Sequence, residues 1–296
     1  MSNTFLFATA VLIWGSTWLA IEFQLGVVAP EVSLVYRSVA ASIMLFIWCK
    51  IKGLSVIFKP KHHIWFALMG LLLFGLNYVL AYRAQIYLTS ALSAIAFSTL
   101  LWMNIINSRI FFGVKAGRRL YGGAFLGTIG ICVLFGPRIS EVSLSDGIFY
   151  GSLLAVTSAL LASFGNMASQ SAQKAQLPVV QSNAWSMLYG CAFTAVLAFV
   201  GGHEYTFDWS FGYAVSLTYL AIFGSVLAFG AYLTLLGRIG AHKAGYVTVM
   251  FPVVALILSI LFEGLRLDPG LVAGTFLVLA GNLLVLTNRR ERAMAV

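Results

Sequence analysis

The sequence predicts an all-α membrane protein with ten transmembrane helices, arranged as two five-helix repeats of inverted topology with both termini in the cytoplasm. Composition is the first observation behind this prediction: 60% of the 296 residues are hydrophobic, only 9% are charged, and the mean hydropathy is +0.94. A soluble domain is about a quarter charged. A chain this apolar belongs in lipid, where helices satisfy every backbone polar group internally. The other two observations are the spacing of the apolar segments and an internal repeat.

A membrane-spanning helix needs roughly 20 apolar residues, and ten stretches approach that length. In order, the predicted spans are Phe5–Phe23, Val32–Cys49, Ile64–Tyr82, Ala91–Phe112, Leu120–Phe135, Gly147–Gln170, Val179–Val200, Phe211–Leu236, Gly245–Phe262 and Pro269–Leu286. The fifth is short because Gly136 and Pro137 are expected to end it. The first lacks a basic leader and a small-residue cleavage site, so we expect a retained helix rather than a signal peptide.

Charge is distributed unevenly between the loops. With the N-terminus in the cytoplasm, the inner loops, helix ends and tail carry Lys50, Lys52, Lys59, Lys61, Arg109, Lys115, Arg118, Arg119, Lys174, Arg238, Lys243, Arg289, Arg290 and Arg292. The outer side holds only Arg83, Arg138 and Arg266, and Glu291 is the only acid inside. This positive-inside pattern places both termini in the cytoplasm. The net charge of +9 then predicts contact with anionic membrane lipids, not with nucleic acid.

The sequence resembles itself at a shift of about 150 residues. "LIWGST" (12–17) matches "LASFGN" (161–166), "VLAYRA" (79–84) matches "VLAFGA" (226–231), and "ALSA" (91–94) matches "AHKA" (241–244). Glycines 123 and 130 match glycines 274 and 281. We therefore predict one repeat over residues 1–140 and a second over residues 141–296, which includes a short basic cytoplasmic tail. Five spans per repeat is an odd number, so the second repeat enters the membrane from the opposite face, as in many alternating-access carriers.

"WGST" in the first span and "FPVVALILSILFEG" in the ninth resemble the EamA branch of the drug/metabolite transporter superfamily, over nearly the whole chain. The resemblance implies a transporter with a central cavity between its repeats. The family pattern is a proline followed about eleven residues later by Gly-Glu; the second repeat has Pro252 and Glu263, with the pair reversed. The first repeat has Trp102 or Met103 in place of the proline and Val114 in place of the glutamate, so its fourth helix is expected to be straighter than in relatives.

Arg37 lies about two helical turns inside the second span. An arginine within a span is costly and usually faces a cavity or a partner. One interpretation is that its planar donor fork binds a carboxylate or another anionic group of the substrate. The alternative is an ion pair with Glu22 at similar depth on the first helix. Both hold if the pair is an outer gate that opens when substrate competes for the guanidinium.

Polar and aromatic residues recur at helical spacing in several spans, and these are candidates for a cavity wall. For each one alone, helix packing or an interfacial aromatic belt is the simpler explanation. The candidate substrate-binding residues are Trp14, Trp18, Arg37, Asn77, Tyr78, Tyr82, Trp102, Asn104, Asn166, Trp185, Tyr189, Tyr232 and Tyr246. The candidate gating or coupling residues are Glu22, Arg37, Pro252 and Glu263.

No nucleotide-binding, metal-binding or nucleophile motif is present in the sequence, so we expect no cofactor, no metal and no enzymatic activity. The predicted function is export of a small organic metabolite, such as an amino acid or a related compound, across the inner membrane. Multidrug efflux of lipophilic cations is the alternative, although Arg37 would repel cations. A non-transporting scaffold is a further alternative. Proton coupling through Glu22 or Glu263 and simple uniport both stay open, as does the oligomeric state, including a monomer.

Overall fold

The computed structural model describes residues 1–88, 90–141, 146–262 and 269–286, and this part of the chain is helical with no strand. The helices are α1 (Asn3–Glu22), α2 (Pro30–Ile51), α3 (Pro60–Met69), η1 (Gly70–Gly75), α4 (Leu76–Tyr87), α5 (Ser90–Ser98), α6 (Leu100–Phe112), α7 (Arg118–Glu141), α8 (Asp146–Lys174), α9 (Val179–Val200), α10 (Phe211–Tyr219), η2 (Leu220–Leu227), α11 (Ala228–Ile239), α12 (Ala241–Ala244), α13 (Val247–Phe262) and α14 (Pro269–Leu286). Seven of the described helical stretches are long and apolar enough to cross a membrane.

Most predicted spans correspond to helices whose ends differ from the prediction by a few residues. Two helices, α9 and α14, begin and end where the sequence placed them. Proline explains several beginnings: it stands at the first helical position of α2, α3 and α14, where its missing N–H has no intrahelical partner to lose.

The fourth span is divided, and the fifth is longer than predicted. The fourth span, expected to be straighter than in relatives, consists of two helices, α5 and α6, that meet at Thr99. The Thr99 hydroxyl donates to the carbonyl of Ala96 at 2.6 Å and offers that carbonyl an alternative to the helical hydrogen bond. The fifth span was expected to end at Gly136 and Pro137, yet the α7 backbone stays helical to Glu141. Pro137 removes only one backbone donor, so the neighbouring helical bonds continue past it.

Two long helices contain a π-helical segment that the sequence did not predict. The helix of residues 60–87 is π-helical over η1, and the helix of residues 211–239 is π-helical over η2. Such segments are rare and often occur at functional sites, because they change the direction in which the following side chains point. The two segments fall close to one another on the repeat alignment: η1 ends shortly before "VLAYRA", and η2 ends within the start of "VLAFGA".

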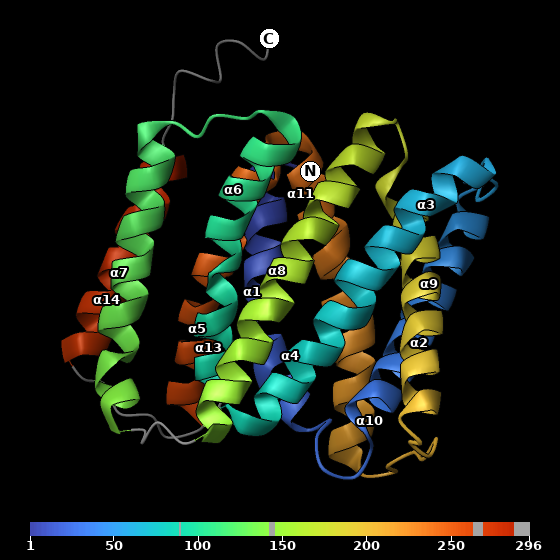
Figure 1. Ribbon diagram of the computed structural model, residues 1–296, viewed down its shortest axis with the longest axis horizontal. Helices are drawn as coiled ribbons and strands as arrows, with labels where there is room; N and C mark the ends of the chain where they lie inside the picture. The colour runs from blue at the N-terminus through green and yellow to red at the C-terminus, as the bar shows by residue number, and fades with distance from the viewer. Residues whose placement is uncertain (89, 142–145, 263–268, 287–296) are drawn as a thin grey trace.

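The helices form a bundle with α7 and α14 at one side, α2 and α9 at the other, and α1 and α8 between them (Figure 1). The outer pairs run antiparallel. On α7 and α14, a Cβ at Gly281 would lie 2.7 Å from the Gly123 carbonyl oxygen, and one at Gly130 would lie 2.9 Å from the Gly274 carbonyl oxygen. The glycines therefore let these two backbones touch.

Large apolar side chains cover the outside of the bundle. Helix faces that no other helix covers expose residues such as Phe125, Val196 and Phe276, whose exposed fractions are 62%, 60% and 70%. An outward apolar surface of this kind suits lipid contact. Many polar side chains are instead buried between helices, and Ser42 and Ser158, for example, each bond a backbone carbonyl of a neighbouring helix.

Candidate substrate site

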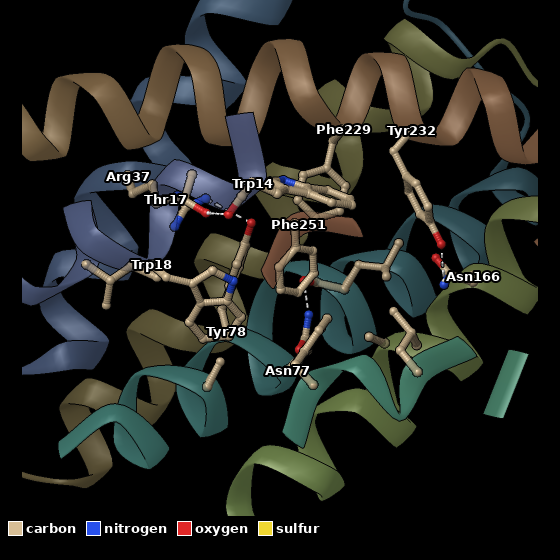
Figure 2. A pocket seen from close by; sticks show the side chains of 16 residues that line it. Trp14, Thr17, Trp18, Arg37, Asn77, Tyr78, Asn166, Phe229, Tyr232 and Phe251 are labelled. Carbon is tan, nitrogen blue, oxygen red and sulfur yellow. Dashed lines mark hydrogen bonds between the residues drawn. The ribbon is translucent and has the colours of Figure 1, made fainter. Parts of the chain in front are cut away.

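A cavity lies at the centre of the bundle, and the space not filled by atoms, open solvent included, is about 640 Å³ (Figure 2). Helices α1, α2, η1–α4, α5, α6, α8, α11 and α13 contribute to its wall, so both halves of the chain meet there. We call it the central cavity, and its lining residues are Trp14, Thr17, Trp18, Ile21, Arg37, Leu73, Asn77, Tyr78, Ala81, Phe97, Leu100, Ala162, Asn166, Phe229, Tyr232 and Phe251. Arg37 is the only charged residue among them.

Three neutral hydroxyl groups hold the Arg37 guanidinium. Its side chain is only 2% exposed. Nε donates to the Ser225 hydroxyl at 2.8 Å, Nη2 donates to the Tyr78 hydroxyl at 2.8 Å, and Nη1 donates to the Tyr82 hydroxyl at 3.3 Å. The guanidinium carbon also lies 4.4 Å from the centre of the Tyr78 ring, within cation–π range. The guanidinium is thus oriented by its neighbours, but none of them neutralises it.

The ion pair between Arg37 and Glu22 does not form. Within the described part of the chain, Arg37 forms no ion pair with any carboxylate. Glu22 instead accepts a hydrogen bond from the Ser90 hydroxyl. The buried carboxylate in the first turn of α2 is Glu31, which pairs with Arg83 at 2.6 Å. Arg37 therefore keeps an uncompensated charge in the cavity wall.

Aromatic rings form most of the remaining wall. Trp14 lies between two of them, with its ring centre 4.8 Å from that of Phe229 and 4.8 Å from that of Tyr232. Trp18 contacts Phe251 at 5.8 Å between ring centres. The indole nitrogen of Trp14 donates to the Gly224 carbonyl at 3.2 Å, which fixes the ring in place. These side chains form a rigid apolar surface suited to a flat or apolar ligand portion.

Two amides reach the cavity, but their hydrogen bonding differs. Both polar atoms of the Asn77 side chain bond within the protein: Nδ2 donates to the Leu73 carbonyl, and Oδ1 accepts from Ser158 at 2.6 Å, which joins α4 to α8. Asn166 Nδ2 donates to the Tyr232 hydroxyl at 2.9 Å, whereas its buried Oδ1 has no partner. Asn77 therefore links two helices, whereas the Asn166 side-chain oxygen is available to accept a hydrogen bond from a ligand.

Of the predicted binding residues, Trp14, Trp18, Arg37, Asn77, Tyr78, Asn166 and Tyr232 line the central cavity. Two others lie directly behind the wall. Tyr82 supports Arg37, and Asn104 Oδ1 accepts from Asn166 Nδ2 at 3.2 Å. These two residues position cavity residues and do not line the cavity.

Four predicted residues lie elsewhere. Trp102 donates to Thr128 on α7 at 2.8 Å, and Tyr246 donates to the Leu120 carbonyl at 3.0 Å, so both tie helices to α7. Trp185 and Tyr189 on α9 pack around His63 at the start of α3, outside the cavity. Regular i, i+4 spacing places two side chains on one helix face but does not say which neighbour that face meets.

The gating candidates are scattered. Glu22 is an exposed residue at the end of α1. Pro252 lies within α13, directly after the cavity residue Phe251, and the helix continues through it. Glu263 lies outside the described residues, as does the basic tail.

Sequence analysis missed Phe97, Phe229 and Phe251 in the wall, and Ser225 beside Arg37. The internal repeat carried a signal for two of them. At the 147-residue offset of "VLAYRA" and "VLAFGA", Tyr78 and Tyr82 correspond to Ser225 and Phe229. Nothing in the sequence separates Phe97 from the lipid-facing phenylalanines.

The described residues that line the cavity supply one cation, hydroxyls, amides and aromatic rings, which are groups that bind a ligand. The described residues include no group of three or more His, Cys, Asp or Glu side chains placed to hold a metal ion.

Comparison with known proteins gives a consistent result. The profile of the EamA-like transporter family matches residues 1–136 and again residues 149–287. The uncharacterized transporter YoaV of Bacillus subtilis is 22% identical over 92% of this chain and 92% of its own length. Protein PagO of Salmonella typhimurium is 24% identical over 98% of this chain and 96% of its own. The uncharacterized inner membrane transporter YedA of Escherichia coli is 27% identical over 84% of this chain and 78% of its own.

A solved crystal structure superposes on this fold with a TM-score of 0.80 at 20% identity, covering 99% of this chain and 98% of its own. At that identity the likeness shows the fold alone. The family match spans nearly the whole sequence, and the apolar helices supply the membrane-crossing segments. The chain therefore belongs to the EamA-like transporter family, as a multi-pass transporter of the inner membrane.

Proposed function

We propose that this transporter exports a small carboxylate-bearing metabolite, amino acids and related compounds included, by alternating access through the central cavity. The uncompensated charge of Arg37 carries this proposal. Placing an arginine at the centre of a membrane helix costs about 3 kcal/mol even where the surroundings adapt. A substrate carboxylate would supply the missing counter-charge, and the planar guanidinium fork matches its geometry.

Several contacts support two inverted repeats with the cavity between them. Helices that correspond in the two repeats pack antiparallel: besides α7 and α14, Ser42 on α2 bonds the Ala184 carbonyl of α9, while the Val35 carbonyl approaches Cys191. The first helix of each half packs against the other half, α1 on α11 and α13, and α8 on α4 and α6. Two copies related by a two-fold axis in the membrane plane give this pattern.

The charged loops support a cytoplasmic N-terminus. The N-terminus and the loops at 52–59, 113–117 and 175–178 lie at one end of the bundle, and the loops at 23–29 and 201–210 lie at the other (Figure 1). Lys52, Lys59 and Lys115 belong to the first set, and Glu204 and Asp208 to the second. Excess lysine at one end marks that end as cytoplasmic.

Counterflow of labelled carboxylates into proteoliposomes tests the proposal. Arg37→Gln removes the charge and should lower carboxylate transport at least tenfold, because a hydrogen bond to a charged group contributes about 1.5–3 kcal/mol. Arg238→Gln is the matched control, since Arg238 is on an exposed helix end and bonds the Met1 carbonyl. Normal carboxylate transport by Arg37→Gln would contradict the proposal.

The aromatic wall also suits a lipophilic cation, because ring faces attract positive charge. The same proteoliposomes separate the two functions. Carboxylate export predicts no transport of tetraphenylphosphonium. Cation transport that survives or increases in Arg37→Gln, with no carboxylate transport by either protein, would favour multidrug efflux.

A further inference from the structure

The central cavity has a second polar pole, formed by Asn166 and Tyr232. Both residues are 1% exposed and line the cavity. Figure 2 shows them at one side of the pocket and Arg37 at the other, with Trp14, Phe229 and Phe251 between them. Polar groups therefore stand at both ends of an aromatic middle.

The hydrogen bonds of this pole are incomplete. Asn166 Nδ2 donates both to Asn104 Oδ1 at 3.2 Å and to the Tyr232 hydroxyl at 2.9 Å, which leaves Asn166 Oδ1 buried without a partner. The Tyr232 oxygen accepts one of these bonds and still has its own proton to donate. A buried acceptor without a partner costs roughly 1–3 kcal/mol, so a ligand that bonds it recovers that cost. The pole offers one acceptor and one donor.

One helix carries a hydrogen-bond partner of each pole, Ser225 for Arg37 and Tyr232 for Asn166, so the distance between the poles can be estimated from it. Arg37 bonds Ser225, and Asn166 bonds Tyr232, seven residues further along the continuous helix of η2 and α11. At about 1.5 Å per residue, these positions are roughly 10 Å apart along the axis. The carboxylate and ammonium of one α-amino acid centre are bonded to the same carbon, so that centre alone cannot reach both poles.

We infer that the central cavity selects an organic anion that carries a hydroxyl or carboxamide at its far end, separated from the carboxylate by an apolar segment about one aromatic ring long. The carboxylate binds Arg37. The apolar segment lies against Trp14, Phe229 and Phe251. The distal group donates to Asn166 Oδ1 and accepts from the Tyr232 hydroxyl. The inference rests on the proposed function, because it assigns the carboxylate to Arg37.

Binding of a matched pair of acids to the purified transporter tests the distal pole. 4-Hydroxyphenylacetate and phenylacetate differ only in the distal hydroxyl and carry no ammonium group. Wild type should bind the hydroxylated acid about fivefold more tightly, the gain expected for a neutral hydrogen bond. Tyr232→Phe keeps the ring contact with Trp14 and should reduce this preference, and Asn166→Leu should abolish it.

Tyr246→Phe is the matched control, because Tyr246 is a fully buried tyrosine whose hydroxyl bonds the Leu120 carbonyl outside the cavity. Equal binding of the two acids by wild type would overturn the inference while leaving the proposed function intact. So would an undiminished preference in folded Tyr232→Phe and Asn166→Leu proteins. Failure of both acids to bind wild type, with other carboxylates transported, would overturn this choice of substrate class. Failure of every carboxylate would overturn the proposed function as well.

Discussion

At the scale of single residues, the central feature is a guanidinium whose donors are directed by neutral partners. Two of those partners, Tyr78 and Ser225, occupy corresponding positions of the two repeats and approach Arg37 from opposite halves. Hydroxyls hold the donor fork without neutralising it, which leaves its charge available to an anion. Glu22, the expected partner, bonds Ser90.

Tyr78 should be more important for binding than Tyr82. Its hydroxyl is closer to the guanidinium, at 2.8 Å against 3.3 Å, and its ring forms the cation–π contact and part of the wall. We expect Tyr78→Ala to weaken carboxylate binding by about 1–3 kcal/mol, because it removes an aromatic wall and a hydrogen bond together. Tyr82→Phe should weaken binding by less than about 1 kcal/mol. Titration of both purified variants checks this order, and a larger loss in Tyr82→Phe would contradict it.

At the scale of helices, close approach through glycine sets the shape of the cavity. Gly15 on α1 packs directly on α13: a Cβ there would lie 2.4 Å from Val254 Cβ and 3.0 Å from the Phe251 carbonyl oxygen. Trp14 and Phe251 line the cavity beside this contact. The glycine therefore brings α1 and α13 together and places the two aromatic walls.

Gly15→Ala should consequently destabilise the protein, because Val254 Cβ is attached to the backbone and cannot rotate away. Overpacking of this kind costs about 1–3 kcal/mol. Gly230→Ala on α11 is the control: no atom lies within 4 Å of the added methyl, and alanine favours helix by about 1 kcal/mol. Thermal unfolding in detergent should show a lower transition temperature for Gly15→Ala and an unchanged or higher one for Gly230→Ala. Equal stability of Gly15→Ala and wild type would contradict this, because it would show that α1 and α13 are further apart than in the structure.

The presence of a helix could be predicted from the sequence because segment length and hydropathy determine it. For α9 and α14, the predicted first and last residues are those of the structure. Interruptions within a helix could not be predicted, because they depend on local hydrogen bonds such as that of the Thr99 hydroxyl. Site membership was predictable only in part. Polar and aromatic groups within a span usually face a cavity or a partner, and this criterion selected Arg37, Trp14 and Asn166. Trp102 and Trp185 met the same criterion, but their helix faces turn to other neighbours, which only packing decides.

At the scale of the whole molecule, the cavity belongs to neither half alone. Five lining helices precede residue 141 and three follow it, if the π segments are counted with their helices. Rocking of one half against the other would therefore change access to the site without rebuilding either half. Two oppositely inserted halves would also give the site an equivalent route to each side of the membrane.

Substituted-cysteine labelling tests the central claim most directly, namely that Arg37 binds an anion in a water-reachable cavity. Cys49, Cys132 and Cys191 would be replaced by alanine, and Thr17→Cys would place a thiol in the cavity wall. Val196→Cys, on an outward face of α9, is the control that should stay unreactive in the bilayer. We expect a charged methanethiosulfonate reagent to modify the thiol of Thr17→Cys, and a transported carboxylate to slow the reaction in the Arg37 protein but not in Arg37→Gln. An unreactive thiol in Thr17→Cys, or equal protection in both proteins, would contradict the claim.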